Sequence, residues 1–150
     1  MPTVARRRTI AGPPEELWQV VSDPYHLPRW WPGVLRVEEA SAGAWTKVLT
    51  TPKRKSVRAD YSVVRAEAPR LLTWRQEVEE TPFERILSES LTDISLEPDG
   101  ADTRVELRAR LRLRGLSRLG ALQIRRATAR QLDEALDGLA RLAGDSGDRR

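Results

Sequence analysis

Residues 102–114 read DTRVELRARLRLR, and every second position from Thr103 to Leu113 is apolar or small, while Arg and Glu stand between them. Successive side chains of an extended chain point to opposite faces. The period of two therefore predicts a β-strand with one face in the core and the other in water. Such one-sided strands are typical of antiparallel sheets, in which one face can remain solvated.

Turn-forming clusters divide the region that ends with this strand into segments of similar length. These clusters are Ser41-Ala42-Gly43, Thr51-Pro52-Lys53, Ala68-Pro69-Arg70, Thr81-Pro82 and Pro98-Asp99-Gly100. The predicted strands are 34–40, 43–51, 55–66, 70–79, 84–97 and 102–114, and Thr3–Ala11 adds one more before the turn at 12–14. The connections are too short for parallel crossovers, so successive strands should pair as antiparallel hairpins.

Helical patterns lie on both sides of the six strands between residues 34 and 114. Before them, residues 14–22 predict a short helix that begins at Pro14, and residues 25–30 leave room for one or two further turns. After them, apolar residues recur at helical spacing over about 25 residues that follow Gly115, with Ser117 as the candidate N-cap.

The long helix and its end set the expected domain boundary. Gly120 and Gly138 fall inside the helical pattern, and each weakens the helix by about 1 kcal/mol relative to alanine. Residues 145–150 contain no apolar side chain and are expected to form a disordered tail. Residues 1–144 are thus expected to form a single α+β domain.

Four segments carry a resemblance to a known superfamily. PEELWQVVSDP (14–24), LPRWWPGV (27–34), RLLTWR (70–75) and TRV (103–105) resemble the polyketide cyclase/dehydrase and lipid-transport families of the START-like (SRPBCC) superfamily. This resemblance, over about residues 3–143, implies a helix-grip fold: a seven-stranded curved antiparallel sheet wrapped around a long C-terminal helix, with two short helices after the first strand. Similar domains hold lipids, hormones, quinones or polyketides between sheet and helix, which implies an internal cavity here.

The resemblance leaves three functions open. The first is binding of a small hydrophobic or amphipathic ligand, such as a lipid, quinone or polyketide, for carriage, sequestration or sensing. The second is a polyketide cyclase or aromatase that uses the same cavity, with Tyr61, Ser90 and a strand arginine such as Arg58 or Arg75 assisting proton transfer. The third is a co-chaperone-like protein-interaction domain. No nucleophile and base pair is visible and His26 is the sole histidine, so the catalytic residues stay unknown.

Composition excludes several other classes. The chain has no cysteine, so disulfides and thiolate chemistry are excluded, and with one histidine no metal set or cofactor fingerprint can be assembled. We expect neither metal nor cofactor.

No apolar run approaches the ~20 residues that span a bilayer, which favours a cytoplasmic protein. The net charge of +4 comes mostly from arginines dispersed among acids, so nucleic acid is not expected as a partner despite Arg6–Arg8 and Lys53–Lys55. Monomer and homodimer both remain open.

Aromatic and hydroxylic residues are the candidate cavity lining. The candidates are Trp30, Trp31, Trp45, Tyr61, Trp74 and Phe83, then Ser88, Ser90 and Thr92 on one face of the strand at 84–97, and Leu122, Ala129, Leu132 and Leu136 on the long helix. Plain core packing competes with ligand contact for each aromatic residue, because a slip of one residue in register reverses which side chains face inward. Buried hydroxyls would need partners from backbone, water or ligand.

Overall fold

The computed structural model describes residues 3–41, 43–50, 56–78, 87–114 and 120–148. Along the chain the elements are β1 (Thr3–Ile10), α1 (Pro14–Val21), the 3-10 turn η1 (Pro24–His26), α2 (Leu27–Trp30), β2 (Val34–Ser41), β3 (Ala44–Thr50), β4 (Ser56–Glu67), β5 (Leu71–Gln76), β6 (Leu87–Asp99), β7 (Asp102–Leu113) and α3 (Ala121–Asp148). The predicted order of strands and helices is confirmed. Ser117 and Phe83 lie outside the described residues.

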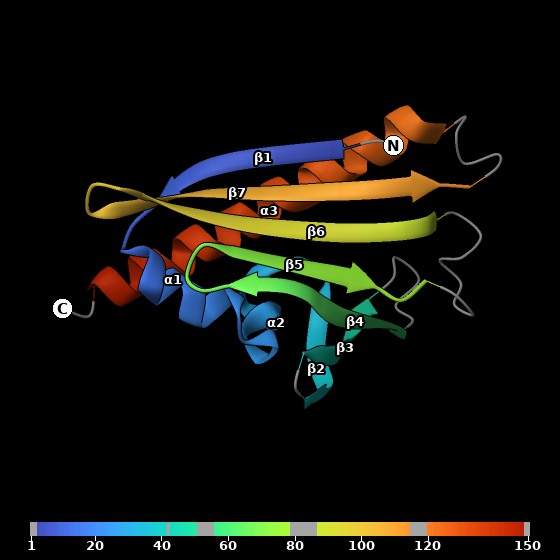
Figure 1. The fold of residues 1–150 in the computed structure, drawn as a ribbon, viewed down its shortest axis with the longest axis horizontal. Coiled ribbons are helices and arrows are strands. Elements are labelled where there is room, and N and C mark those ends of the chain that lie inside the picture. Colours follow the sequence, from blue (N-terminus) through green and yellow to red (C-terminus); the bar gives the residue numbers. More distant parts are fainter. Residues whose placement is uncertain (1–2, 42, 51–55, 79–86, 115–119, 149–150) are drawn as a thin grey trace.

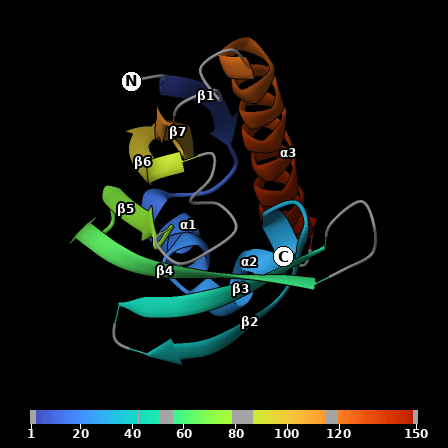
Figure 2. The ribbon, with the colours of Figure 1, turned by 90° about the vertical axis from the view of Figure 1, so that its right-hand side faces the viewer.

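A single antiparallel sheet contains all these strands, in the order β1-β7-β6-β5-β4-β3-β2 (Figure 1). From β2 to β7 each strand pairs with the next along the chain, and β1 closes the series beside β7. The sheet curves strongly. A view along the strands shows α3 on the concave side of the sheet, with α1 and α2 on the same side (Figure 2). The helix-grip architecture is therefore confirmed.

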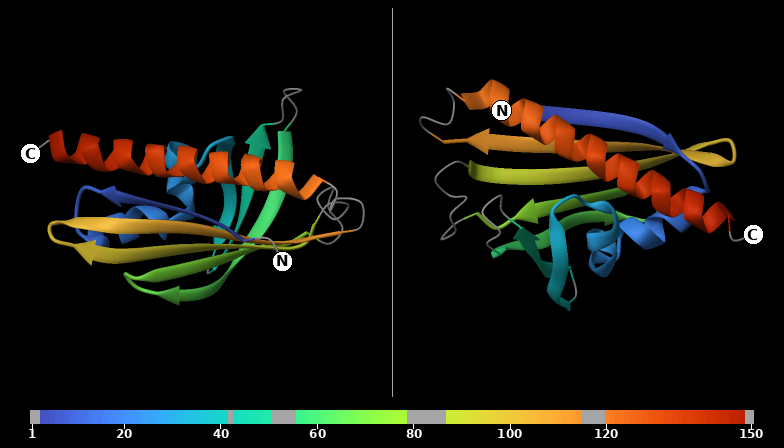
Figure 3. Two further views of the ribbon diagram at one scale, coloured as in Figure 1. Left: turned by 90° about the horizontal axis from the view of Figure 1, so that it is seen from above. Right: turned by 180° about the vertical axis from the view of Figure 1, so that it is seen from behind.

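α3 runs lengthwise over the concave face (Figure 3), and its main contacts are with β1, β7 and α2. Arg6 of β1 forms an ion pair with Asp133 of α3, and Arg8 forms one with Asp137. These pairs are exposed, so each contributes at most about 1 kcal/mol. Arg7 pairs with Glu106 at 3.2 Å, so the predicted basic patch at Arg6–Arg8 is neutralised by acids.

The core is sealed along the middle of α3 and looser toward the start of the helix. Leu132, Leu136 and Leu139 are at most 2% exposed and belong to the same apolar cluster as the inner residues of β7. Toward the start of the helix, Ile124 and Thr128 are only half-buried. The middle of α3 therefore covers the sheet more completely than the start of α3 does.

Two details of α3 differ from the sequence-based expectations. The helix continues to Asp148, so residues 145–148, expected in a disordered tail, extend it instead. Helical spacing also placed Leu122 on the inner face, which is wrong, because this side chain is 61% exposed and lines a surface groove between α3 and β1. Among the described residues, no helix is long and apolar enough to cross a membrane.

Gly138 marks the closest approach of α3 and α2. A Cβ atom added there would lie 2.5 Å from the carbonyl oxygen of Trp30 and 2.8 Å from its Cα. Backbone atoms cannot move aside as a flexible side chain can, so this glycine is required by packing rather than being a weak point of the helix. It fixes the position of Trp30 and Trp31 relative to the sheet.

We expect Gly138→Ala to lower the free energy of unfolding by about 2 kcal/mol, because the overlap outweighs the ~1 kcal/mol that alanine contributes within a helix. Urea unfolding followed by circular dichroism measures this change. Gly144→Ala is the matched control, since a Cβ at Gly144 meets nothing within 4 Å. That control should be neutral or slightly stabilising, and equal effects of the two substitutions would contradict the packing role of Gly138.

Candidate functional site

Four indoles and one phenol gather on the concave side of the sheet, at β3, β4, β5 and the end of α2. We call Trp30, Trp31, Trp45, Tyr61 and Trp74 the aromatic cluster. Trp74 is its centre, with ring centroids 6.3 Å from Trp30, 5.6 Å from Trp31 and 5.4 Å from Trp45. Tyr61 stacks on Trp45 at 5.9 Å, almost parallel to it. The structure therefore brings together five of the six aromatic candidates, while Phe83 lies outside the described residues.

Strand register explains why these rings face the same way. Trp45 pairs with Tyr61 across β3 and β4, and Tyr61 pairs with Gln76 of β5. Residues directly opposite one another share a sheet face. The indoles are nearly fully buried, with exposed fractions from 2% to 6%, whereas Tyr61 is half-buried. The aromatic cluster is thus closed on most sides and most accessible at Tyr61.

Lys47 of β3 reaches into this aromatic cluster. Its Nζ lies 4.2 Å from the ring centroid of Tyr61, 4.6 Å from that of Trp31 and 5.0 Å from that of Trp74. The residue is 2% exposed. Burial lowers the pKa of Lys47 to about 7 and raises the pKa of the Tyr61 hydroxyl. An amine in this state exchanges between charged and neutral forms near neutral pH.

Other buried polar atoms in the same region have no partner. The indole nitrogens of Trp30 and Trp45 and the amide nitrogen of Gln76 are buried without a hydrogen bond among the described residues. Most buried polar groups in proteins are paired, so each such atom calls for an explanation. Here Trp30 and Trp45 belong to the aromatic cluster that Lys47 enters, and Gln76 pairs with Tyr61 of the same cluster.

The inner face continues from the aromatic cluster along β6. Thr92 pairs with Trp74 and with Ala109, and Ser90 pairs with Leu111, so both hydroxyls point to the concave side. Both residues remain half-buried, as does Val63 of β4. The inner face around Tyr61, Ser90 and Thr92 is therefore less completely covered than the part under the middle of α3.

Ser88 lies at an irregularity of the sheet, and its place beside Ser90 in a ligand site stays a prediction. The register between β6 and β7 shifts between Leu87 and Glu89, so Leu87 rather than Ser88 pairs with the buried Leu113. The Ser88 hydroxyl donates to the carbonyl oxygen of Arg112 at 3.3 Å. A β-bulge inserts one unpaired residue and thereby reverses the alternation on one side of it.

The remaining candidates on α3 are packing positions. Ala129 is 9% exposed, Leu132 is 1% exposed and Leu136 is 2% exposed, and all three belong to the apolar core. Their contact with a ligand stays a prediction. The arginines named for proton transfer lie elsewhere, since Arg58 is exposed and pairs with Glu38 at 2.7 Å, and Arg75 is exposed as well.

Lys47 is the residue that sequence reasoning missed. Lysine usually lies at a solvated position. Because Thr46 is polar as well, the sequence around Lys47 does not show which of the two side chains faces the core. One signal was available: Trp45, Lys47 and Leu49 alternate along one strand, so an inward Trp45 places Lys47 inward as well.

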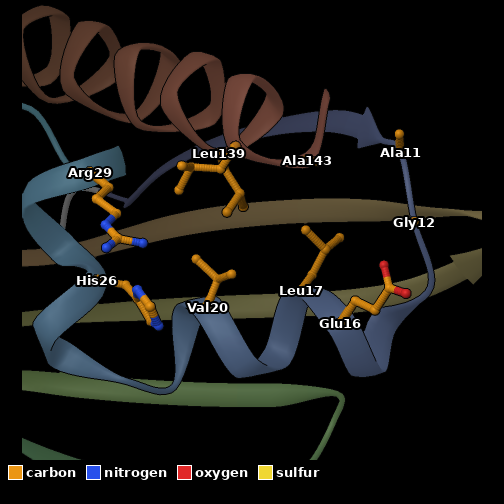
Figure 4. A pocket seen from close by; sticks show the side chains of 10 residues that line it. Ala11, Gly12, Glu16, Leu17, Val20, His26, Arg29, Leu139 and Ala143 are labelled. Carbon is orange, nitrogen blue, oxygen red and sulfur yellow. The ribbon is translucent and has the colours of Figure 1, made fainter. Parts of the chain in front are cut away.

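A separate pocket of about 240 Å³ lies between α1, η1, α2 and the end of α3. Figure 4 shows the apolar side chains of Leu17, Val20 and Leu139 around it, with His26 and Arg29 on one side. His26 pairs with Asp23 at 3.6 Å. No residue of the aromatic cluster lines this pocket, so it is distinct from the site around Lys47.

A curved antiparallel sheet closed over a C-terminal helix, with an aromatic concave face, defines a START-like helix-grip protein. The chain belongs to the family described as polyketide cyclase / dehydrase and lipid transport, whose model matches residues 1–144. The expected resemblance to this superfamily is thereby confirmed. None of the curated proteins compared with the chain matches it significantly.

Solved structures show the same fold at low sequence identity. A START superfamily protein from Mycobacterium smegmatis is 12% identical with a TM-score of 0.77, covering 95% of this chain and 97% of that one. A conserved protein from Geobacillus kaustophilus is 14% identical with a TM-score of 0.78 and 97% coverage of both chains. The di-domain ARO/CYC protein BexL from the BE-7585A biosynthetic pathway is 22% identical with a TM-score of 0.77, covering 94% of this chain and 46% of BexL.

Proposed function

We propose that this protein binds a small hydrophobic or amphipathic ligand with an aromatic or polycyclic body, on the inner face between the aromatic cluster and β6, for carriage, sequestration or sensing. The observation that carries this proposal is the aromatic cluster itself, which is closed around Trp74 but accessible at Tyr61. Flat apolar molecules stack on such rings, and each aromatic contact adds about 0.5–1.5 kcal/mol beyond its buried area.

Incomplete coverage of the inner face supports the same proposal. A purely structural core would be sealed along its full length, yet Tyr61, Ser90 and Thr92 are half-buried on the concave side. START-like proteins that bind ligands hold them between the sheet and the long helix, and the inner face around Tyr61, Ser90 and Thr92 is the corresponding part of this protein. Hydroxyls at Ser90 and Thr92 add polar groups to an otherwise apolar wall, which suits an amphipathic ligand better than a pure hydrocarbon.

Titration with methyl 1-naphthoate, a neutral bicyclic probe, is expected to quench tryptophan fluorescence saturably and to raise Tm. A probe present at about 100 times its Kd stabilises the folded state by about 2.7 kcal/mol. Ser90→Phe should fill the inner face and weaken binding at least tenfold. Fluorescence titration and thermal unfolding of the wild type and the variant measure both effects.

Ser95→Phe is the matched control, because Ser95 lies on the same strand but lines a groove on the opposite face of the sheet. It should leave the affinity for the probe unchanged. Absence of saturable binding by the wild type, or equal loss in both variants, would contradict a site on the inner face.

A further inference from the structure

We propose that the ligand carries an acid group, such as a carboxylate, and that Lys47 binds this group within the aromatic cluster. This inference rests on the proposed function, because it names a chemical feature of the ligand bound at that site. It concerns the polar end of the ligand, whereas the rings of the aromatic cluster hold the apolar body.

Lys47 is a buried cation without an anion. Among the described residues no carboxylate lies within ion-pair distance of its Nζ, and its recorded contacts are with the rings of Tyr61, Trp31 and Trp74. Contacts between an ammonium and aromatic rings offset only part of the free-energy cost of burying an unpaired ion. The site thus retains a residue that destabilises the empty protein, which is typical of functional positions.

The neighbouring unpaired groups share one property with Lys47, since all of them donate hydrogen bonds. An indole nitrogen can only donate, so Trp30 and Trp45 each present a donor without an acceptor. The amide nitrogen of Gln76 adds another. A carboxylate supplies two acceptor oxygens and a negative charge, and therefore complements both the ammonium and the unpaired donors in this part of the structure. A ligand without acceptors would leave these groups unpaired.

Among the residues that the structure describes, two carboxylates near β3 and β4 have hydrogen-bond partners other than Lys47. Asp60 accepts a hydrogen bond from the hydroxyl of Thr46 at 2.5 Å, and Glu77 accepts one from Ser62 at 3.2 Å. Thr46 neighbours Lys47 in β3 and therefore points to the opposite face of the sheet. Access to Nζ is at Tyr61, the half-buried ring nearest to it, and the flexible lysine stem lets the ammonium turn toward that side.

The charge of Lys47 should make this binding depend on pH. Its cross-strand partners are Val37 of β2 and Ala59 of β4, and the rings that contact it are those of Tyr61, Trp74 and Trp31. Of these only Tyr61 titrates, and burial raises its pKa, so it stays neutral through the neutral range. Burial lowers the pKa of Lys47 to about 7, so its ammonium form declines above that pH.

The test compares 1-naphthoic acid with its methyl ester between pH 5 and pH 9, by quenching of tryptophan fluorescence. A Trp18→Phe background restricts the signal to Trp30, Trp31, Trp45 and Trp74, which all belong to the aromatic cluster. We expect the acid to bind at least tenfold more tightly than the ester at pH 6, and this preference to fall toward unity by pH 9. Lys47→Met should abolish the preference, so that the acid and the ester bind this variant with equal affinity at pH 6.

Arg58→Met is the matched control, because it removes one positive charge from the outer face of the adjacent strand, where Arg58 pairs with Glu38. It should keep the preference for the acid. Equal binding of acid and ester by the wild type, or an acid preference that survives Lys47→Met, would overturn the role of Lys47 while leaving the proposed function intact. If neither probe binds, the proposed function itself fails and this inference fails with it.

Discussion

Trp74→Ala is expected to lower the free energy of unfolding by about 3–5 kcal/mol, the range for removal of a large buried aromatic side chain. Trp74 is 2% exposed and its ring contacts the indoles of Trp30, Trp31 and Trp45. Its removal leaves a cavity between β5 and the end of α2, which the surrounding rings can fill only in part. Chemical unfolding monitored by far-UV circular dichroism measures the change.

Trp18→Ala gives the comparison within the same residue type. Trp18 lies on α1 and is half-buried at the edge of the core, so its loss should cost about half as much or less. Where Trp74→Ala does not fold, Trp74→Phe retains a ring and should cost about 1–2 kcal/mol. If Trp74→Ala lowered the free energy of unfolding no more than Trp18→Ala does, the central position of Trp74 in the core would be contradicted.

Lys47→Met is expected to stabilise the protein by about 1–4 kcal/mol at pH 6, since an apolar side chain of similar length replaces a buried ammonium. The advantage should shrink as the pH rises. Burial lowers the pKa of Lys47 to about 7 in the folded protein, against about 10.4 for an unperturbed lysine. Between these values the unfolded chain binds more protons than the folded one, so the stability of the wild type increases with pH.

Across this window the difference between variant and wild type should fall by roughly 4 kcal/mol, because each pKa unit corresponds to about 1.36 kcal/mol. Below pH 7 both states carry the proton and the full cost of the buried charge remains. Urea unfolding at intervals from pH 6 to pH 10 measures the trend. Arg58→Met should show no such slope, and a constant difference between Lys47→Met and wild type would show that Lys47 does not titrate in this range.

The fold was predictable because its signals are local. Alternation in residues 102–114 and the turn clusters before it define strands and their hairpin pairing without knowledge of distant contacts. The helical spacing after Gly115 likewise defines α3. The predicted boundaries of β1, α1, β2, β3, β4 and β7 agree with the structure to within one residue.

The candidate site was predicted in part. Trp30, Trp31, Trp45 and Trp74 do converge, because large aromatic residues on a one-sided sheet are drawn to the covered face. Ser88 lies at a register shift between β6 and β7, which no local pattern revealed, and Leu122 is exposed although it fits the helical spacing.

The sequence by itself determined the order of the elements, the antiparallel pairing of the strands and the two faces of the sheet, since these follow from side-chain periods of 2 and 3.6 residues. The tertiary structure alone decided that Lys47 lies among aromatic rings and that Gly138 lets α2 approach α3. A period of two specifies two faces but not which of them is covered, and a close approach depends on atoms far apart in the sequence. The unpaired donors of Trp45 and Gln76 come near the same part of the sheet only because Tyr61 of β4 pairs with both residues.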